Sequence, residues 1–392
     1  MVTTSPLRIL AVFARLGCLS FGGPVAHLAY FREEFVQRRR WLDEATFGEC
    51  VALTQLLPGP SSSQTGMLVG WLRGGPAGAL AAWIGFTTPS AVLMAAFALA
   101  TPRWLPPGPI HALLLVAAAV VASAVVTMRS TLAPDALRLC FAMATLVLVL
   151  SVHVPVVGPL AIAGGAVAGA FFLRGRVDVS APKLDLRISA RAGIAVLIAF
   201  AIVFFGLDVL ARGTHSNVWQ LCDVLFRVGS LVFGGGHVVL PLLQRELATN
   251  GMLSNNALLA GYAAAQAMPG PLFTIASFVG ASAFGGALGW RGAIAGTLAI
   301  FAPSFFLLAG VAPFYRKLSE SRTFRAGIAG TNASVVGLLS AALVTPIGTS
   351  AIHSWLDAAI ALGAFAVLTL LRWPAWVLVA VAALAGFFFR GV

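Results

Sequence analysis

Charged side chains are scarce in this sequence. Asp, Glu, Lys and Arg make up only 10% of its 392 residues, whereas 59% of the residues are hydrophobic. Apolar runs of about 18–25 residues recur along nearly the whole chain, and this is the length that an α-helix needs to cross a bilayer. The composition therefore predicts an all-α polytopic integral membrane protein, whose partner is the lipid bilayer.

Cysteine, histidine and nucleotide-binding motifs are also sparse. The four cysteines stand isolated without a CxxC pair, and the six histidines show no ligand spacing, which argues against a disulfide framework and a metal site. The chain has no Walker-type GxxxxGK[ST] motif, so we expect no ATP hydrolysis within it. An intramembrane enzyme would need a nucleophile with a base, which is not found. We predict no enzymatic activity and no cofactor.

Positive charge is the one excess. Lys and Arg outnumber Asp and Glu by 25 to 13, and the basic residues gather in a few short loops between apolar runs. This pattern is typical of cytoplasmic loops in membrane proteins rather than of a nucleic-acid surface. We therefore expect a multi-pass protein of the inner (plasma) membrane without a nucleic-acid partner. The sequence is compatible with a homodimer.

A polar, helix-breaking segment lies between the apolar runs 46–57 and 65–72. Proline cannot donate a backbone hydrogen bond, so its Pro-Gly-Pro core must interrupt any helix. In hydrocarbon, interrupted backbone survives only where it is buried in protein or lines a watery cavity. The residues of this segment that we predict to bind substrate are Gln55, Pro58, Gly59, Pro60, Ser61, Ser62, Ser63 and Gln64.

The helices around the first glycine-rich segment are too short to span a bilayer. The stretch 7–21 reaches about 22 Å at 1.5 Å per residue, against about 30 Å of hydrocarbon. It ends at Gly22, Gly23 and Pro24, and a second short stretch follows over 25–36. We predict a broken or re-entrant pair here. The glycines either let substrate approach the backbone or serve close helix packing.

Both elements return in the second half of the chain. Corresponding positions lie 211 to 214 residues apart over some seventy residues, which indicates an internal duplication. The second copies of the two elements, which we also predict at the substrate, contain Gly234, Gly235, Gly236, His237, Gln266, Pro269, Gly270, Pro271 and Thr274.

Loop charges predict that the two repeats are inverted. The loop 32–40 carries four arginines, while the matching region 245–256 carries one; the loops 101–109 and 316–325 reverse this contrast. Inverted repeats with broken helices are a recurrent design of secondary transporters. The predicted parts are an N-terminal repeat (1–173), a basic cytoplasmic linker (174–191), a linking transmembrane helix (192–211) and a C-terminal inverted repeat (212–392).

The start of the helix after Pro60 suits an anion. Free amide groups and the positive end of the helix dipole are found there. Hydroxyl and amide side chains fill this first turn, whereas the second copy offers only Thr274 and Ser277, so we expect most anion contacts in the first half. The alternative is that the serines only cap a helix end.

Four ionisable residues allow two interpretations each. Arg15 either contacts a bound dianion or extends to the interface. By contrast, Arg227 has a partner for its charge in Asp223, four residues earlier. Glu49 either carries protons or is an interfacial acid. His27 and His237 either titrate near neutral pH and couple protons, or cap exposed backbone.

These motifs together resemble the chromate ion transporter family, in its two-domain form, over nearly the whole chain. The residues that carry the resemblance are the Phe21-Gly22-Gly23-Pro24 segment with His27, Arg39, Trp41-Leu42, the 55–64 segment, Gly70, Trp83-Ile84-Gly85-Phe86 and Pro89-Ser90, followed by 233–237 and 266–271. The resemblance implies export of chromate, a tetrahedral oxyanion, from the cytoplasm and chromate resistance. The alternative is a transporter or passive pathway for sulfate, a chromate analogue, or for another oxyanion.

Overall fold

The structure, a computed structural model, describes residues 4–21, 23–104, 107–152, 157–177, 184, 186, 188–232 and 239–388. It is 87% helical, and the residues described include no strand. Within them, the helical segments long and apolar enough to cross a membrane are Ser61–Ala100, His111–Leu132, Ala190–Thr214, Gly286–Phe314 and Arg322–Ala351. The predicted class, an all-α polytopic membrane protein, is confirmed.

The chain begins with short helices, as predicted. They are α1 (Pro6–Leu19), α2 (Gly23–Arg32), which continues as the π-helix η1 (Glu33–Arg38), and α3 (Glu44–Leu56). The 14 residues of α1 reach only about 21 Å. Asp43 caps α3, because its Oδ1 accepts from the amide of Thr46 at 2.7 Å. The chain is therefore broken twice before its first long helix.

The long helix α4 (Ser61–Trp104) consists of two arms joined by a sharp reversal. Its backbone leaves the helical region at Gly74 and Gly75, and the φ of 63° at Gly75 favours glycine. Gly70 and Gly78 then lie so close together that neither has room for a Cβ atom. The reversal follows directly after the predicted apolar run 65–72.

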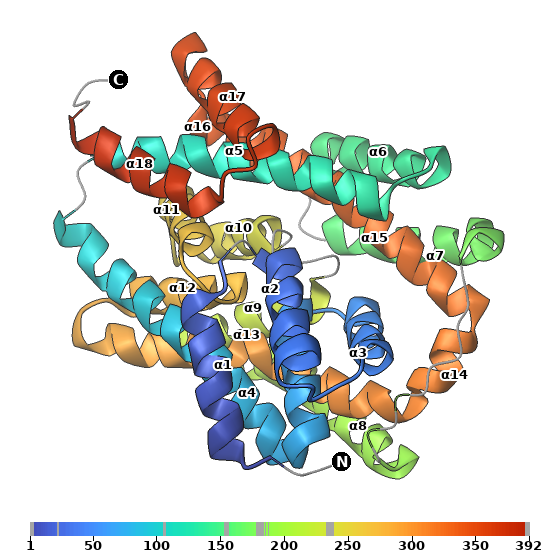
Figure 1. Cartoon of the computed structure of the whole chain (residues 1–392). Helices are drawn as coiled ribbons and strands as arrows, with labels where there is room; N and C mark the ends of the chain where they lie inside the picture. The colour runs from blue at the N-terminus through green and yellow to red at the C-terminus, as the bar shows by residue number, and fades with distance from the viewer. Residues whose placement is uncertain are drawn as a thin grey trace. The chain divides into compact units, whose positions relative to one another are not determined.

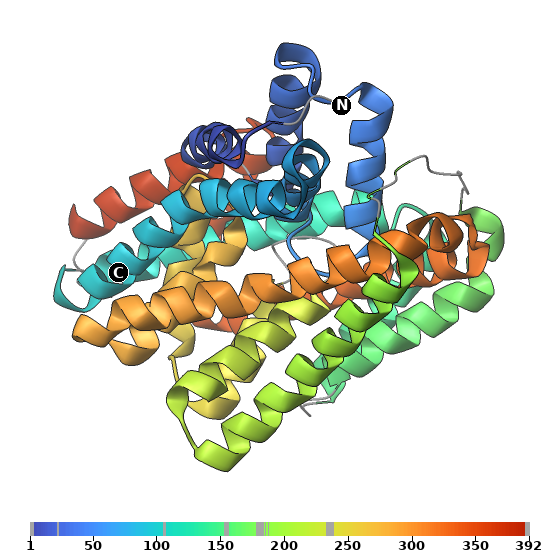
Figure 2. The same ribbon diagram turned by 90° about the horizontal axis from the view of Figure 1, so that it is seen from below.

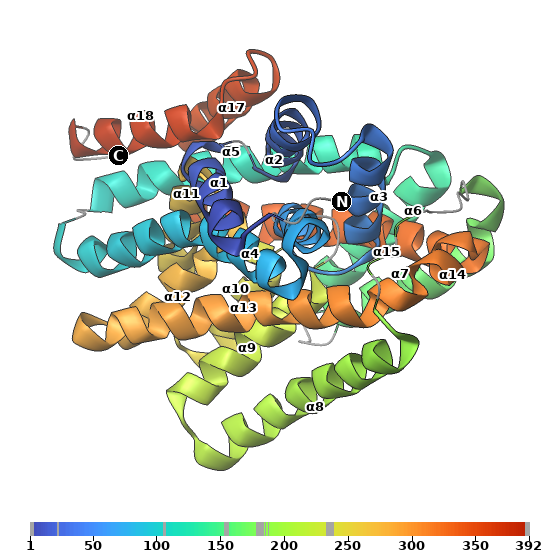
Figure 3. The ribbon, with the colours of Figure 1, turned by 60° about the horizontal axis from the view of Figure 1, so that its bottom comes forward.

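The second half also contributes a closely packed pair of helices, α12 (Ile275–Phe284) and α13 (Gly289–Val311). Its elements in the same part of the molecule are α8 (Ala190–Thr214), α9 (Asn217–Leu231), η4 (Leu272–Thr274), α12 (Ile275–Phe284), η5 (Gly286–Leu288), α13 (Gly289–Val311), η6 (Ala312–Phe314) and α14 (Tyr315–Glu320). Gly280 of α12 and Gly292 of α13 are in close contact, as Gly70 and Gly78 are. Figures 2 and 3 show α13 beside α9, with α8 alongside.

Two compact units each take segments from both halves of the chain. Unit 1 comprises Met1–Leu99, Ser180–Gly236 and Met268–Glu320, and unit 2 comprises Ala100–Val179, His237–Ala267 and Ser321–Val392. The predicted repeat boundaries concern the order along the chain and the orientation in the membrane, and they stay predictions. Both Pro-Gly-Pro breaks belong to unit 1, so the candidate site is described within that unit.

Unit 2 is built around α15 and α5 (Figure 1). α15 packs along α6 and α7, and α5 packs on α17 and α18. The His111 Nε2 and Asp357 Oδ1 atoms, 2.8 Å apart, connect α5 to α17. The elements of this unit are α5 (Pro107–Leu132), α6 (Ala136–Ser151), α7 (Val157–Phe172), η2 (Arg174–Arg176), α10 (Val239–Asn250), α11 (Asn255–Ala267), α15 (Arg322–Ala342), η7 (Leu343–Gly348), α16 (Thr349–Ala351), α17 (Trp355–Thr369) and α18 (Ala375–Phe388).

Candidate functional site

Each Pro-Gly-Pro break binds the end of a helix from the other half of the chain. The amide of Gly59 donates to the carbonyl of Val232, which ends α9, at 2.7 Å. In the same way, the amide of Gly270 donates to the carbonyl of Ser20, which ends α1, at 2.9 Å. The carbonyl groups at the C-terminal end of a helix have no N–H donor within the helix. The breaks supply that partner, and so join the two halves inside unit 1.

The first break leads directly into the buried N-terminus of α4. Ser62 and Ser63 in its first turn are 3% and 2% exposed, and Gln64 is fully buried. The amide groups of a first helical turn have no acceptor within the helix, and the helix dipole is positive at this end. A buried helix N-terminus with hydroxyl groups around it suits an anion.

Gln64 holds the break in place. Its Nε2 donates to the carbonyl oxygen of Pro58 at 2.7 Å and lies 3.3 Å from Ser304 Oγ of α13. The side chain therefore closes the Pro-Gly-Pro turn from inside the helix that follows and links it to the second half. Gln64 thus has a positioning role that the sequence did not reveal.

Several buried polar atoms of unit 1 have no hydrogen-bond partner in the described part of the chain. Buried polar groups are normally paired, so a group of unpaired ones indicates a polar ligand or solvent. We call these residues the polar cluster. Its atoms are Ser20 Oγ, Ser63 Oγ, Gln64 Oε1, Trp83 Nε1 and Thr87 Oγ1.

Direct contacts connect the elements that carry the polar cluster. His27 Nδ1 of α2 lies 3.2 Å from Ser62 Oγ, and the His27 ring packs edge-on against Phe86 of the second α4 arm at 5.2 Å between ring centroids. The Trp83 ring packs against Phe301 and Phe305 of α13 at 5.8 and 5.5 Å. Phe301 and Phe305 flank Ser304, the hydrogen-bond partner of Gln64. These contacts link α2, both arms of α4 and α13.

Sequence reasoning missed Ser20, Trp83 and Thr87 as site residues. Trp83 and Thr87 lie four residues apart, which places them on one face of the helix. Polar side chains at this spacing in an apolar helix were the available signal. Ser20 carried no such signal, because its position depends on how α1 ends.

The second half presents fewer free donors. Thr274 Oγ1 donates to the Pro271 carbonyl at 2.8 Å, and Ser277 Oγ donates to the Ala91 carbonyl at 2.7 Å. The neighbouring Phe273 is buried and packs against Phe301 at 6.0 Å. The hydroxyls of this copy are used within the protein, which supports the expectation that most anion contacts lie in the first half.

The other predicted site residues are spread more widely. Arg15 and Gln55 are exposed, Glu49 is half-buried, and Gly23 and Pro24 are half-buried at the start of α2. The structure does not bring Arg15 into the polar cluster, so both interpretations of this residue stay predictions. Gln266 belongs to unit 2, where it is a hydrogen-bond partner of Tyr262. Gly22, Gly234, Gly235, Gly236 and His237 lie outside the described residues.

Arg227 is paired as the sequence predicted. Its Nε lies 2.8 Å from Asp223 Oδ1, and its Nη2 lies 3.4 Å from Asp208 Oδ1. The guanidinium also stacks over the ring of Phe204 at 4.8 Å. These contacts give Arg227 a structural role in joining α8 to α9.

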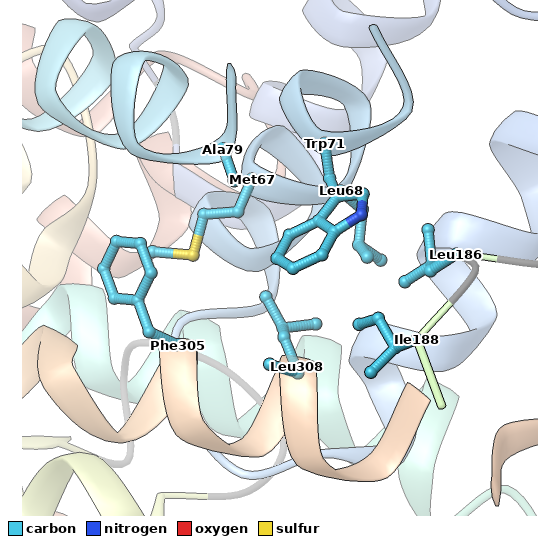
Figure 4. A pocket seen from close by; sticks show the side chains of 9 residues that line it. Met67, Leu68, Trp71, Ala79, Leu186, Ile188, Phe305 and Leu308 are labelled. Atoms are coloured by element: carbon cyan, nitrogen blue, oxygen red, sulfur yellow. The ribbon is translucent and has the colours of Figure 1, made fainter. Parts of the chain in front are cut away.

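A separate pocket of unit 1 is apolar (Figure 4). It lies between the two α4 arms, α13 and the segment that carries Leu186 and Ile188. No side chain around it is charged, so it does not suit an oxyanion. Its lining residues are Met67, Leu68, Trp71, Ala79, Leu186, Ile188, Phe305, Leu308 and Ala309.

Comparison with known proteins supplies the family. The chromate transporter family model matches residues 7–170 and 219–387. This chain belongs to the chromate transporter family. The chromate transport protein of Pseudomonas aeruginosa is 30% identical to it over 86% of this chain and 80% of its own length. No solved structure matches the chain.

Two further relatives cover most of the chain. An uncharacterized transporter of Methanocaldococcus jannaschii is 27% identical over 87% of this chain and 84% of its own length. A probable chromate transport protein of Synechococcus elongatus is 24% identical over 88% and 85%, respectively. The resemblance inferred from the motifs is confirmed, and membership of the family supports a role in chromate transport by a multi-pass membrane protein.

Proposed function

We propose that this transporter exports chromate from the cytoplasm across the inner membrane, that this export confers chromate resistance, and that the anion binds at the polar cluster. The observation that carries the proposal is the buried N-terminus of α4 beside unpaired side-chain donors. Ser63 Oγ, Thr87 Oγ1 and Trp83 Nε1 are buried and have no partner among the residues that the structure describes. Each is able to donate a hydrogen bond to an oxyanion.

The membrane potential is sufficient to drive export. Each negative charge that leaves a negative interior gains about 2.3 kcal/mol per 100 mV. Uptake of the same ion against this field would need coupled cations. Export therefore requires no nucleotide-binding site, in keeping with the absence of a Walker motif from the sequence.

The test removes hydroxyls that have no partner inside the protein. Ser63→Ala and Thr87→Val leave no protein group unpaired, so the thermal stability of the purified protein should stay the same or rise. If each hydroxyl bonds the anion, its loss removes a hydrogen bond to a charged group, worth about 1.5–3 kcal/mol, and chromate transport should fall about 10- to 150-fold.

A matched control is Thr297→Val on α13. Thr297 is also buried, but its Oγ1 donates to the Ala293 carbonyl of its own helix at 2.8 Å. This variant should transport chromate at the rate of the unmodified protein. Transport is measured as chromate released from inside-negative proteoliposomes that contain only this chain. Normal transport by both Ser63→Ala and Thr87→Val would refute the proposed site.

The two halves of the chain should contribute unequally to anion binding. Replacement of Ser62, Ser63 and Gln64 by alanine should abolish transport while the protein remains in the membrane. The corresponding change at Thr274 and Ser277 should have a milder effect, because these hydroxyls bond to backbone carbonyls. Equal losses would contradict the asymmetry.

A further inference from the structure

The orientation of the Gln64 side chain follows from hydrogen-bond chemistry. The oxygen of the Pro58 carbonyl only accepts, so the amide nitrogen of Gln64, 2.7 Å away, must face it. The opposite atom, Oε1, is then an acceptor. It is buried and has no partner among the described residues. A buried acceptor without a partner is unfavourable, so this atom is open to a donor from a ligand.

Donors and this acceptor lie in the same polar cluster. Ser63 Oγ, in the same helical turn as Gln64, and Thr87 Oγ1 are both buried, and neither has a partner in the described ranges of the chain. A ligand bound to these three side chains can accept hydrogen bonds from the two hydroxyls and donate one to Gln64 Oε1. A fully deprotonated tetrahedral oxyanion only accepts, and its oxygens would repel the lone pairs of Gln64 Oε1. An oxyanion that carries one hydroxyl meets both requirements.

We propose that the site binds chromate in its monoprotonated form, hydrogen chromate. The O–H of the ion donates to Gln64 Oε1, and its remaining oxygens accept from the first turn of α4, from Ser63 and from Thr87. This inference rests on the proposed function, since it concerns the same site. It has a consequence for specificity. Hydrogen chromate loses its proton near neutral pH, whereas hydrogen sulfate loses its proton only in strong acid. Sulfate therefore lacks the hydroxyl that the site requires.

Titration of the protein must be separated from titration of the ion. Among ionisable side chains, His27 of α2 contacts this turn through Ser62, whereas Arg15 of α1 is exposed and Glu49 of α3 is half-buried. The facing α13 residues 301–308 contain no ionisable side chain. Selenate distinguishes titration of the protein from titration of the ion, because it is a tetrahedral dianion that stays deprotonated from pH 6 to pH 9. Any change in the protein affects the binding of both ions.

The experiment measures the dissociation constants of chromate and selenate for the purified full chain from pH 6 to pH 9. The dissociation constant for total chromate should rise about tenfold per pH unit above the pKa of hydrogen chromate, while that for selenate should lack this slope. Gln64→Met removes the acceptor and should reduce the preference for chromate over selenate at pH 6. Thr297→Val should retain both behaviours.

Parallel pH profiles for the two ions would overturn the proposal, as would chromate binding of constant affinity over this range. These results leave the proposed function in place, because chromate would still bind. Folded protein that binds neither ion at any pH would refute the proposed site itself, and the two failures are thus distinguishable.

Discussion

Gly59 offers the sharpest test of how the first break is held. Its φ of +116° is a conformation that residues with a side chain rarely adopt. A Cβ atom at this position would lie 2.5 Å from Gln64 Nε2 and 3.0 Å from Ser304 Oγ. The substitution Gly59→Ala therefore strains the backbone and displaces the amide that closes the turn on Pro58.

Backbone strain and the lost hydrogen bond together set the expected loss in the free energy of unfolding. Holding a residue other than glycine in a rare backbone conformation costs about 1–3 kcal/mol. Loss of the hydrogen bond from Gln64 to Pro58 costs about 0.5–1.5 kcal/mol more. We expect Gly59→Ala to lower the free energy of unfolding by about 2–4 kcal/mol, which corresponds to a rise of about 30- to 700-fold in the unfolding equilibrium constant.

The assay is reversible unfolding of the purified protein in mixed detergent and dodecyl sulfate, followed by tryptophan fluorescence. Gly48→Ala is the matched control, since Gly48 is an exposed glycine of α3 with no atom within 4 Å of the added Cβ. It should increase the free energy of unfolding by up to about 1 kcal/mol, because alanine is the better helix former. If Gly59→Ala unfolds at the same denaturant concentration as the unmodified protein, the account of this turn is wrong.

Two further predictions concern the first basic loop and the membrane orientation. Burial of the Glu34 carboxyl raises its pKa, but the hydrogen bond and charge of Arg39 and the nearby Arg38 outweigh this effect, so the pKa lies below its usual value. A lowered pKa in the folded state means stability that is present above the usual glutamate pKa and is lost as the pH falls through the lowered one. The melting temperature should thus drop more between pH 6 and pH 3 in the unmodified protein than in Glu34→Gln, and equal drops would exclude a contribution from this pair. For the orientation, tags at positions 38, 182 and 320 should be accessible from the cytoplasm and tags at 105 and 250 from outside, and labelling of 38 and 250 from one side would contradict the inverted repeats.

The sequence by itself determined the class of the protein and the places where its helices break. Apolar length is a local property, so the composition was enough to predict a polytopic helical protein. The Pro58 and Pro269 breaks followed from the chemistry of proline, which acts on its own helix. The salt bridge of Arg227 with Asp223 was also predictable, because residues four apart meet on one helix face.

Only the tertiary structure decided which of these polar groups meet. The Gly59–Val232 and Gly270–Ser20 hydrogen bonds join residues far apart in the chain, and no local pattern specifies such a pair. The same holds for Gln64, whose Nε2 donates to the Pro58 carbonyl while its Oε1 has no partner among the described residues. Trp83 and Thr87 carry free donors because the reversal at Gly75 folds the second arm of α4 back on the first. Burial and pairing are properties of the packed chain, and they separate a positioning residue from one that is free to bind a ligand.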